Sequence, residues 1–192
     1  MVTRAQALWV FLFALAASLP DNSIGLFLKF FFPQMPLVGG LISSTLVAAL
    51  MYIGLVPAPR LGAGMLYTVV LLAVAIVTSS FGQPGIYKLL IGVILGAYLD
   101  ISLFLLRYRR FAYLFAVSTV VPLSVPITYF VWDLLGVYGP QFSFKESMLD
   151  YWNGLLCGTY LILGIVGALL GDYVFRTRLK GLERVKSLRA ET

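Results

Sequence analysis

The chain has 192 residues, of which 60% are hydrophobic and 11% are charged, and its formal net charge is +6. About a quarter of the residues in an ordinary water-soluble domain are charged, so this composition excludes a soluble globular fold. With one cysteine and no histidine, the chain has no material for an internal disulfide, a thiolate zinc site or histidine-based catalysis.

The apolar residues gather into six runs, each suited to crossing a bilayer. A spanning helix needs about 20 residues, because each residue rises about 1.5 Å through a hydrocarbon core about 30 Å thick. Few residues remain between the runs, so we expect one all-α membrane domain over residues 1–192, a polytopic bundle of six transmembrane helices. The predicted spans are residues 5–19, 37–56, 62–80, 86–106, 111–135 and 151–175.

The first run is short and follows Arg4. One positive charge, an apolar core and the segment Ala16-Ala17-Ser18 are also typical of a secretory signal peptide. Cleavage would leave five spans, and the basic tail would then require an external amino terminus, so we favour a retained first span. The following loop, residues 20–36, is apolar and contains three prolines, which predicts a lid or re-entrant plug. Its candidate lid residues are Lys29, Phe31 and Gln34.

Basic residues are divided unevenly between the two sides of the six-span arrangement. Eleven of the fourteen lysines and arginines fall on one side, whereas Lys29, Lys88 and Lys145 fall on the other. Cytoplasmic loops carry the basic excess, so both termini are expected in the cytoplasm of a cell-membrane protein. The tail 176–192 directly follows an apolar run, which favours lipid headgroups over nucleic acid as its partner. The longer loops then lie outside and offer material for a pocket.

Small residues recur at intervals of four in three spans, and such faces let helix backbones approach closely. Packing inside the bundle and docking of another membrane subunit both remain open as their role. In the fourth span the stripe also carries Lys88 and Asp100, on one face with Gly92 and Gly96. We expect a larger side chain at Gly96 to destabilise the bundle. The remaining small residues are Gly40, Ser44 and Ala48, then Gly154 with Gly158, and Gly167 with Gly171.

Asp100 lies seven residues before Arg107, which corresponds to about 10 Å along a helix. An acid at this depth is costly and usually faces a partner or a wet cavity. Two interpretations remain open for Asp100: a structural hydrogen bond, with Arg107 as one candidate partner, or ligand binding.

The fifth span contains Pro122 and Pro126, which leave the carbonyls of Ser118 and Pro122 without their helical donors. We expect Ser124 and Thr128 to hydrogen-bond these carbonyls. The alternative is a helix that opens there to line a cavity.

Polar and aromatic residues converge at the predicted external surface. An interfacial aromatic belt explains the rings but not an acid or an amide. Apolar walls with a few directed polar groups are typical of a ligand pocket, and here they suit a small, flat, polar heterocycle that stacks on the rings. Substitution of Asp133 or Asn153 is expected to weaken binding more than folding. The candidate substrate-binding residues are Gln83, Tyr87, Tyr129, Trp132, Asp133, Trp152 and Asn153, with Asp100 deeper in the span.

Catalytic motifs are absent from the sequence. It contains no nucleophile elbow, P-loop, paired-carboxylate motif or metal-ligand cluster, and the acids of its spans are scattered singly. We therefore expect a protein that is not an enzyme and that carries no cofactor.

Two segments carry a resemblance to a known family. Gly85-Ile86-Tyr87-Lys88-Leu89-Leu90 leads into a span in which Asp100 precedes the turn Arg107-Tyr108-Arg109-Arg110 by seven residues. The last span, with its glycines from Gly164 to Gly171, ends at Arg176 and Arg178. Over about residues 80–180 this pattern resembles the S components of energy-coupling factor (ECF) transporters, most closely the aminopyrimidine, thiamine-precursor type.

The resemblance implies a six-span subunit that captures a vitamin or vitamin precursor outside. It also implies a transmembrane coupling subunit and two ATPase subunits as partners. The chain departs from the family in its first span, which lacks the usual Ala-xxx-Ala docking pattern, so docking would have to use the second and sixth spans. Two other classes remain open: a scaffold or assembly subunit of a membrane complex, similar in size and span number to the rod-shape membrane family, and a lipid-modifying enzyme, which the missing histidines and acid clusters disfavour.

Overall fold

A computed structural model describes residues 2–31, 38–78, 83–139, 143–153 and 156–182, together with residues 185 and 188. Within these ranges the protein is all-α, as the sequence predicts. Seven α-helices are followed by one π-helical turn over Phe175–Leu179. The helices are α1 (Arg4–Phe31), α2 (Val38–Leu55), α3 (Ala63–Ala75), α4 (Tyr87–Leu105), α5 (Arg110–Leu135), α6 (Phe144–Asn153) and α7 (Leu156–Val174).

Three of these helices are long and apolar enough to cross a membrane: α4, α5, and α7 with its π-helical extension, Leu156–Leu179. Shorter apolar helical segments cover Arg4–Pro20, Ser43–Leu55 and Ala63–Ala75. The outward faces carry large exposed apolar side chains, for example Phe104 and Ile162. Lipid can solvate such faces, so these helices suit a multi-pass membrane protein.

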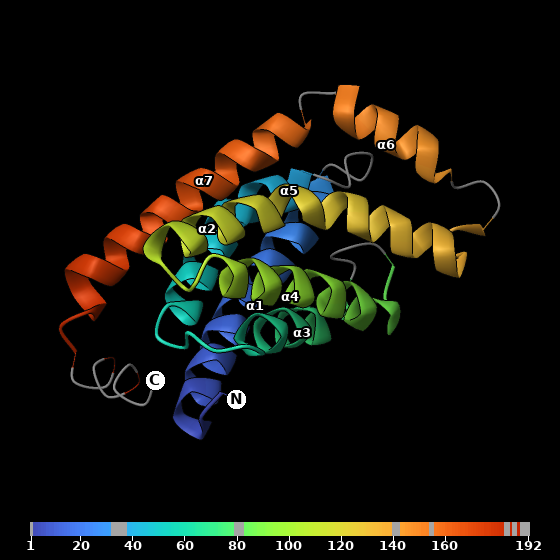
Figure 1. Ribbon diagram of the computed structural model, residues 1–192. Coiled ribbons are helices and arrows are strands. Elements are labelled where there is room, and N and C mark those ends of the chain that lie inside the picture. Colours follow the sequence, from blue (N-terminus) through green and yellow to red (C-terminus); the bar gives the residue numbers. More distant parts are fainter. Residues whose placement is uncertain are drawn as a thin grey trace.

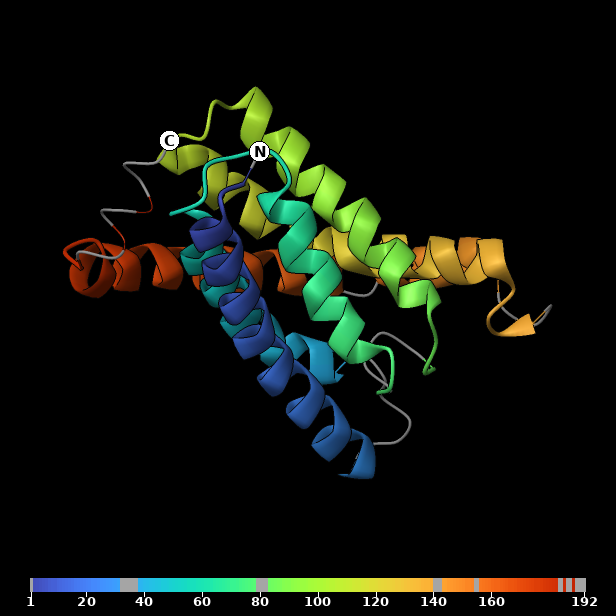
Figure 2. The same ribbon diagram turned by 90° about the horizontal axis from the view of Figure 1, so that it is seen from below.

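The six longer helices form a closed ring. α1 packs against α2 and α3, α3 against α4, α4 against α5, α5 against α7, and α7 returns to α2. Figure 1 shows the start of α1, the end of α7, the α2–α3 connection and the α4–α5 connection on one side of the bundle, and Figure 2 shows the same grouping. The side chain of Gln6 joins the two ends, because its Nε2 donates to the carbonyl of Leu188 at 2.9 Å. The α3–α4 and α5–α6 connections lie on the opposite side.

Glycines allow the closest helix contacts of this ring. A Cβ built at Gly96 of α4 would lie 2.4 Å from the Cα of Met65 in α3, and one at Gly92 would lie 3.1 Å from the carbonyl oxygen of Thr68. On α7, a Cβ at Gly167 would lie 2.4 Å from the carbonyl oxygen of Thr45 in α2. The expected close contact along the α4 stripe is therefore confirmed, and Gly167 likewise packs inside the bundle.

Two predicted loops are helical over part of their length. α1 continues through Pro20 to Phe31, so the loop predicted over residues 20–36 begins later. Pro20 removes only one backbone donor, and nearby side chains bond to main-chain carbonyls: Ser18 to Leu15 at 2.8 Å and Asn22 to Ser18 at 2.7 Å. Neither bond reaches the carbonyl of Ala16, which Pro20 leaves without its helical donor, yet α1 is continuous through the proline.

The predicted last span is also divided. Residues 144–153, placed partly in the fifth loop and partly at the start of that span, form the separate helix α6, and α7 begins only at Leu156. The helix α6 is the most polar of the seven, since its ten residues include Lys145, Glu146 and Asp150. A periodicity of polar and apolar residues, rather than continuous apolarity, distinguishes such a helix from a span. The third span is shorter than predicted, because α3 ends at Ala75.

The contact at Gly96 generates a stability prediction. Gly96→Ala should lower the free energy of unfolding by about 1–3 kcal/mol, since its methyl group would overlap the α3 backbone. The matched control is Gly158→Ala on α7, where an added Cβ meets nothing within 4 Å. Thermal unfolding in detergent is the measurement. Equal melting temperatures for the two variants would contradict the close α3–α4 contact.

Candidate functional site

Asp100 holds the amino-terminal end of α3. Its Oδ1 accepts the backbone N–H of Gly64 at 2.8 Å, and its Oδ2 accepts that of Met65 at 3.1 Å. The first N–H groups of any helix lack an internal partner, and a carboxylate there also complements the helix dipole. Asp100 thus has the structural role that was one of its two interpretations. It lies thirteen residues from Tyr87 along α4, about 20 Å, and so is remote from the other predicted site residues.

Lys88 holds the opposite end of the same helix. Its side chain is fully buried, and Nζ donates to the carbonyls of Ala75 at 2.8 Å and Thr78 at 2.6 Å. The hydroxyl of Thr78 in turn donates to Asn22 of α1 at 2.6 Å. A cation at a helix carboxyl terminus complements the dipole just as an acid does at the other end. The stripe from Lys88 to Asp100 is therefore the docking surface of α4 for α3.

A second buried acid, Asp172 of α7, was missed by the sequence analysis. The hydroxyl of Tyr52 donates to its Oδ1 at 2.7 Å, and Arg110 Nε lies 3.0 Å from the same atom. The guanidinium of Arg176 lies 3.8 Å from its Oδ2. The i, i+4 spacing of Asp172 and Arg176 was readable in the sequence, but Tyr52 and Arg110 are brought there only by the packing of α2, α5 and α7.

Four of the predicted substrate-binding residues do come together. The ring centroids of Tyr129 and Trp132 on α5 are 5.4 Å apart, and Tyr87 at the start of α4 lies beside Trp132. The hydroxyl of Tyr87 donates to the carbonyl of Gln83 at 2.6 Å. Tyr138, which the sequence analysis did not single out, completes this aromatic cluster, with its ring 4.7 Å from that of Trp132. Burial raises the pKa of the Tyr138 hydroxyl, and the backbone of Gln83 partly offsets this rise.

Apart from Asp100, Asp133 is the one remaining predicted site residue whose side chain lies within the described part of the chain. Asp133 is exposed in the last turn of α5. Trp152 and Asn153 end α6, but their side chains lie outside the described part of the chain. Among the lid residues, Lys29 and Phe31 belong to α1 rather than to a loop, their side chains are outside the description, and Gln34 lies outside the described residues.

An open groove of about 260 Å³ runs over the outer face of α5. α4 contributes Tyr98 to it, and α6 and α7 contribute Tyr151 and Cys157. The hydroxyls of Tyr98 and Thr119 hydrogen-bond to each other at the groove wall. The walls are otherwise mostly apolar. The full lining is Tyr98, Thr119, Pro122, Leu123, Pro126, Tyr151 and Cys157.

The two prolines of α5 shape this groove. Pro126 has no N–H, so the carbonyl of Pro122 lacks its helical donor, and the hydroxyl of Tyr151 supplies one at 2.8 Å. The expected partners, Ser124 and Thr128, instead bond the carbonyls of Val121 and Ser124 at 2.7 and 2.6 Å. That expectation was wrong, because a hydroxyl on a helix reaches the carbonyls three or four residues before it. Both prolines line the groove, but α5 stays one continuous helix over Arg110–Leu135, so the expected opening of the helix is not seen.

These contacts limit the chemistry of the described residues. No group of three or more acidic or cysteine side chains that could hold a metal ion occurs within the described ranges. Asp100, Lys88 and Asp172 each neutralise a helix end or a cation. The groove offers mostly apolar contact and one thiol, because its hydroxyls are already bonded within the protein, and such walls suit reversible binding of a small apolar molecule.

The role of Asp100 can be tested by removing its acceptors. Asp100→Ala should cost about 1–3 kcal/mol of stability, because the buried N–H of Gly64 and the partly buried N–H of Met65 would both lose their acceptor. Asp100→Asn should cost less, since its carbonyl oxygen can still accept one of them. Asp133→Ala is the exposed control. Unchanged thermal unfolding of Asp100→Ala would refute the capping role.

Comparison with known proteins gives no relative. No protein-family model matches the chain, no curated protein is similar to it, and no solved structure matches its fold. Its function therefore has to be inferred from the contacts of its own residues.

Proposed function

We propose that this chain is a membrane-embedded substrate-capture subunit, of the kind found in ECF-type importers. In this proposal six helices cross the bilayer, both termini are cytoplasmic, and a small vitamin or vitamin precursor enters from the external side. A transmembrane coupling subunit and two ATPase subunits would supply the energy. The groove over α5 is the single observation that carries the proposal.

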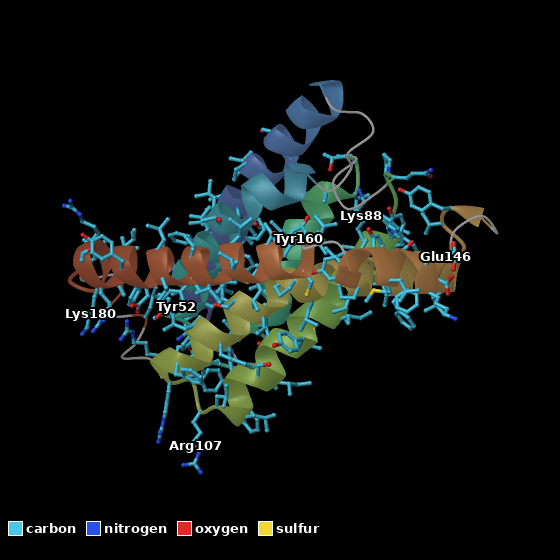
Figure 3. The ribbon with its side chains drawn as sticks, turned by 90° about the horizontal axis from the view of Figure 1, so that it is seen from above. Tyr52, Lys88, Arg107, Glu146, Tyr160 and Lys180 are labelled. Atoms are coloured by element: carbon cyan, nitrogen blue, oxygen red, sulfur yellow. The ribbon has the colours of Figure 1, made fainter. Side chains whose placement is uncertain are left out.

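The grouping of connections and charges supports this topology. The start of α1, the end of α7 and the α2–α3 and α4–α5 connections lie together. In Figure 3, Arg107 and Lys180 lie toward one side of the bundle, and Lys88 and Glu146 lie toward the other. A basic excess at one end matches the distribution that orients multi-pass proteins.

The composition of the groove supports a small ligand that is largely apolar. Ligand pockets usually measure about 300–1,000 Å³, so a groove of about 260 Å³ suits a compact molecule. Its hydroxyl groups, at Tyr98, Thr119 and Tyr151, already bond one another or main-chain carbonyls, so the groove offers a ligand almost entirely apolar contact. The flat heterocycle expected from the sequence remains a suitable class, but these walls favour a less polar member of it.

Tyr151 links the groove to the aromatic cluster. Tyr151 lies near Tyr129 of that cluster and near Cys157 of the groove, and its ring is 6.3 Å from that of Tyr160. Tyr151 therefore packs between the aromatic cluster and the groove, and we place the ligand in the groove beside α6. In this scheme α6, rather than the predicted first loop, covers the site.

The topology makes a direct prediction. Reporter fusions after Arg110 and after Thr192 should both read cytoplasmic, whereas a fusion after Tyr138 should read external, because basic segments resist translocation. Matched alkaline phosphatase and fluorescent protein fusions in cells measure each site twice. An external carboxyl terminus would contradict this prediction. The bundle would then have the opposite orientation in the membrane, and the groove would not lie toward the external side.

Ligand binding can be followed through Cys157, the single cysteine of the chain. Purified protein should be labelled with N-ethylmaleimide in the presence of planar heterocycles, including aminopyrimidines, and followed by intact mass spectrometry. At ten times the dissociation constant about nine-tenths of the protein is occupied, so labelling should slow about tenfold. Leu123→Trp should remove this protection, because its larger ring fills the groove.

Two controls separate the groove from other effects. In a Cys157→Ser, Lys145→Cys double variant the thiol lies on the exposed face of α6, and ligand should leave its labelling unchanged. Asp133→Asn tests the sequence-based site, where binding at least tenfold weaker, about 1.4 kcal/mol, is expected if that carboxylate contacts the ligand. If no heterocycle protects Cys157 and none is carried through purification, the capture proposal fails and a scaffold role replaces it.

A further inference from the structure

Two arginines converge on one buried carboxylate at the end of the bundle that holds the start of α1 and the end of α7. Arg110 of α5 and Arg176 beyond α7 both contact Oδ2 of Asp172, and the Asp172 side chain is 7% exposed. Each arginine side chain is itself 55% exposed. Two cations and one anion leave a net positive charge. The carboxylate therefore positions two guanidinium groups whose remaining donors face outward.

An apolar column leads away from Arg176 along the outer face of α7. Tyr173 precedes Arg176 by three residues and Leu169 precedes Tyr173 by four, so the three lie on one side of the helix. Tyr173 is 66% exposed, and Leu169 and Ile162 are 51% and 61% exposed. Helical rise places Leu169 about 10 Å and Ile162 about 20 Å from Arg176. A charged head and an apolar column of this length match the two parts of a phospholipid.

We propose that this surface binds an anionic phospholipid in the adjoining leaflet. The phosphodiester contacts the outward donors of Arg110 and Arg176, and one acyl chain lies along Tyr173, Leu169 and Ile162. The planar guanidinium fork suits phosphate oxygens, and apolar area along the column supplies affinity that a soluble anion lacks. This site is separate from the groove over α5 and does not depend on the transport proposal.

The surrounding charge selects an anionic lipid over a zwitterionic one. Arg107, Arg109 and Arg178 are also exposed at this end, and in the described part of the chain no acid forms an ion pair with them. A choline or ethanolamine headgroup would bring its own cation into this positive field. A glycerol headgroup adds no positive charge. A basic residue near a membrane surface contributes about fivefold in affinity for anionic lipid.

Native mass spectrometry tests this site. The purified full-length chain is exchanged into mixed micelles containing equal amounts of phosphatidylglycerol and phosphatidylcholine, and the retained lipids are counted. We expect the wild-type chain to favour phosphatidylglycerol, and Arg176→Gln to lower this preference about fivefold. Lys145→Gln removes one positive charge from an exposed position of α6, at the other side of the molecule. This control should leave the preference for phosphatidylglycerol unaltered. Circular dichroism verifies folding, and Arg176→Lys, which keeps the charge, provides a second folded variant expected to retain at least half of the preference.

Three outcomes would overturn the proposal. Equal retention of the two lipids by the wild-type chain would remove the anionic selectivity. An unchanged preference in Arg176→Gln would assign lipid binding to the tail as a whole. Competition by glycerophosphoglycerol, the soluble headgroup, at the same concentration as the lipid would show that the apolar column contributes nothing and that the arginines form a site for soluble phosphate.

Discussion

The attachment of α3 to α4 is the constraint on which the other helix positions depend. α4 carries an acid and a lysine twelve residues apart, and α3 is thirteen residues long, so each charged group reaches one end of the shorter helix. The glycines between them remove the side chains that would hold the backbones apart, and Thr68 adds a hydrogen bond to the carbonyl of Gly92 at 2.7 Å. Because α3 also packs on α1 and α4 on α5, this pair sets the positions of its neighbours in the ring.

On the opposite side of the ring, α7 is also held by close glycine contacts and by a buried charge with a fixed partner. α7 approaches α2 and α5 through glycines, and Asp172 near the end of α7 neutralises Arg110 at the start of α5. Charged groups inside an apolar bundle are tolerated when each has a fixed partner. Each buried charge in the described part of the chain has such a partner on a neighbouring element. These pairs therefore fix how far the helices are shifted along one another.

Much of the helix content could be predicted from the sequence, because continuous apolarity is a strong signal. α2, α4 and α5 begin and end within one residue of their predicted bounds. The stripe on α4 was also readable, since a period of four places its members on one face. The path of α1 beyond Pro20 was not, because a proline is a signal for the end of a helix and α1 nevertheless continues through it. Contacts between distant positions, such as Tyr151 with Pro122 and Arg110 with Asp172, depend on tertiary packing that no local pattern encodes.

The candidate site shows the same division. The aromatic residues at the ends of α4 and α5 could be placed together from topology alone, since antiparallel neighbours bring these ends to one side. The groove could not, because it arises from the spacing between α4, α5 and α7 and from the separate helix α6. A pair of prolines in a span indicates that backbone carbonyls lack their helical donors. Only the fold shows which residue donates a hydrogen bond to such a carbonyl.

The two charges of α4 also bear on how the chain enters the membrane. Lys88 and Asp100 alone would each oppose insertion of that helix by about 2.5–3.5 kcal/mol when carried near the middle of a bilayer. Their partners are backbone groups of α3 and of the turn directly after it, the segment synthesised immediately before α4. A translocon that releases the two helices together as a hairpin would deliver both charges already hydrogen-bonded, whereas release of α4 alone would expose them to lipid. The order of membrane integration is thus coupled to the pairing of these two helices.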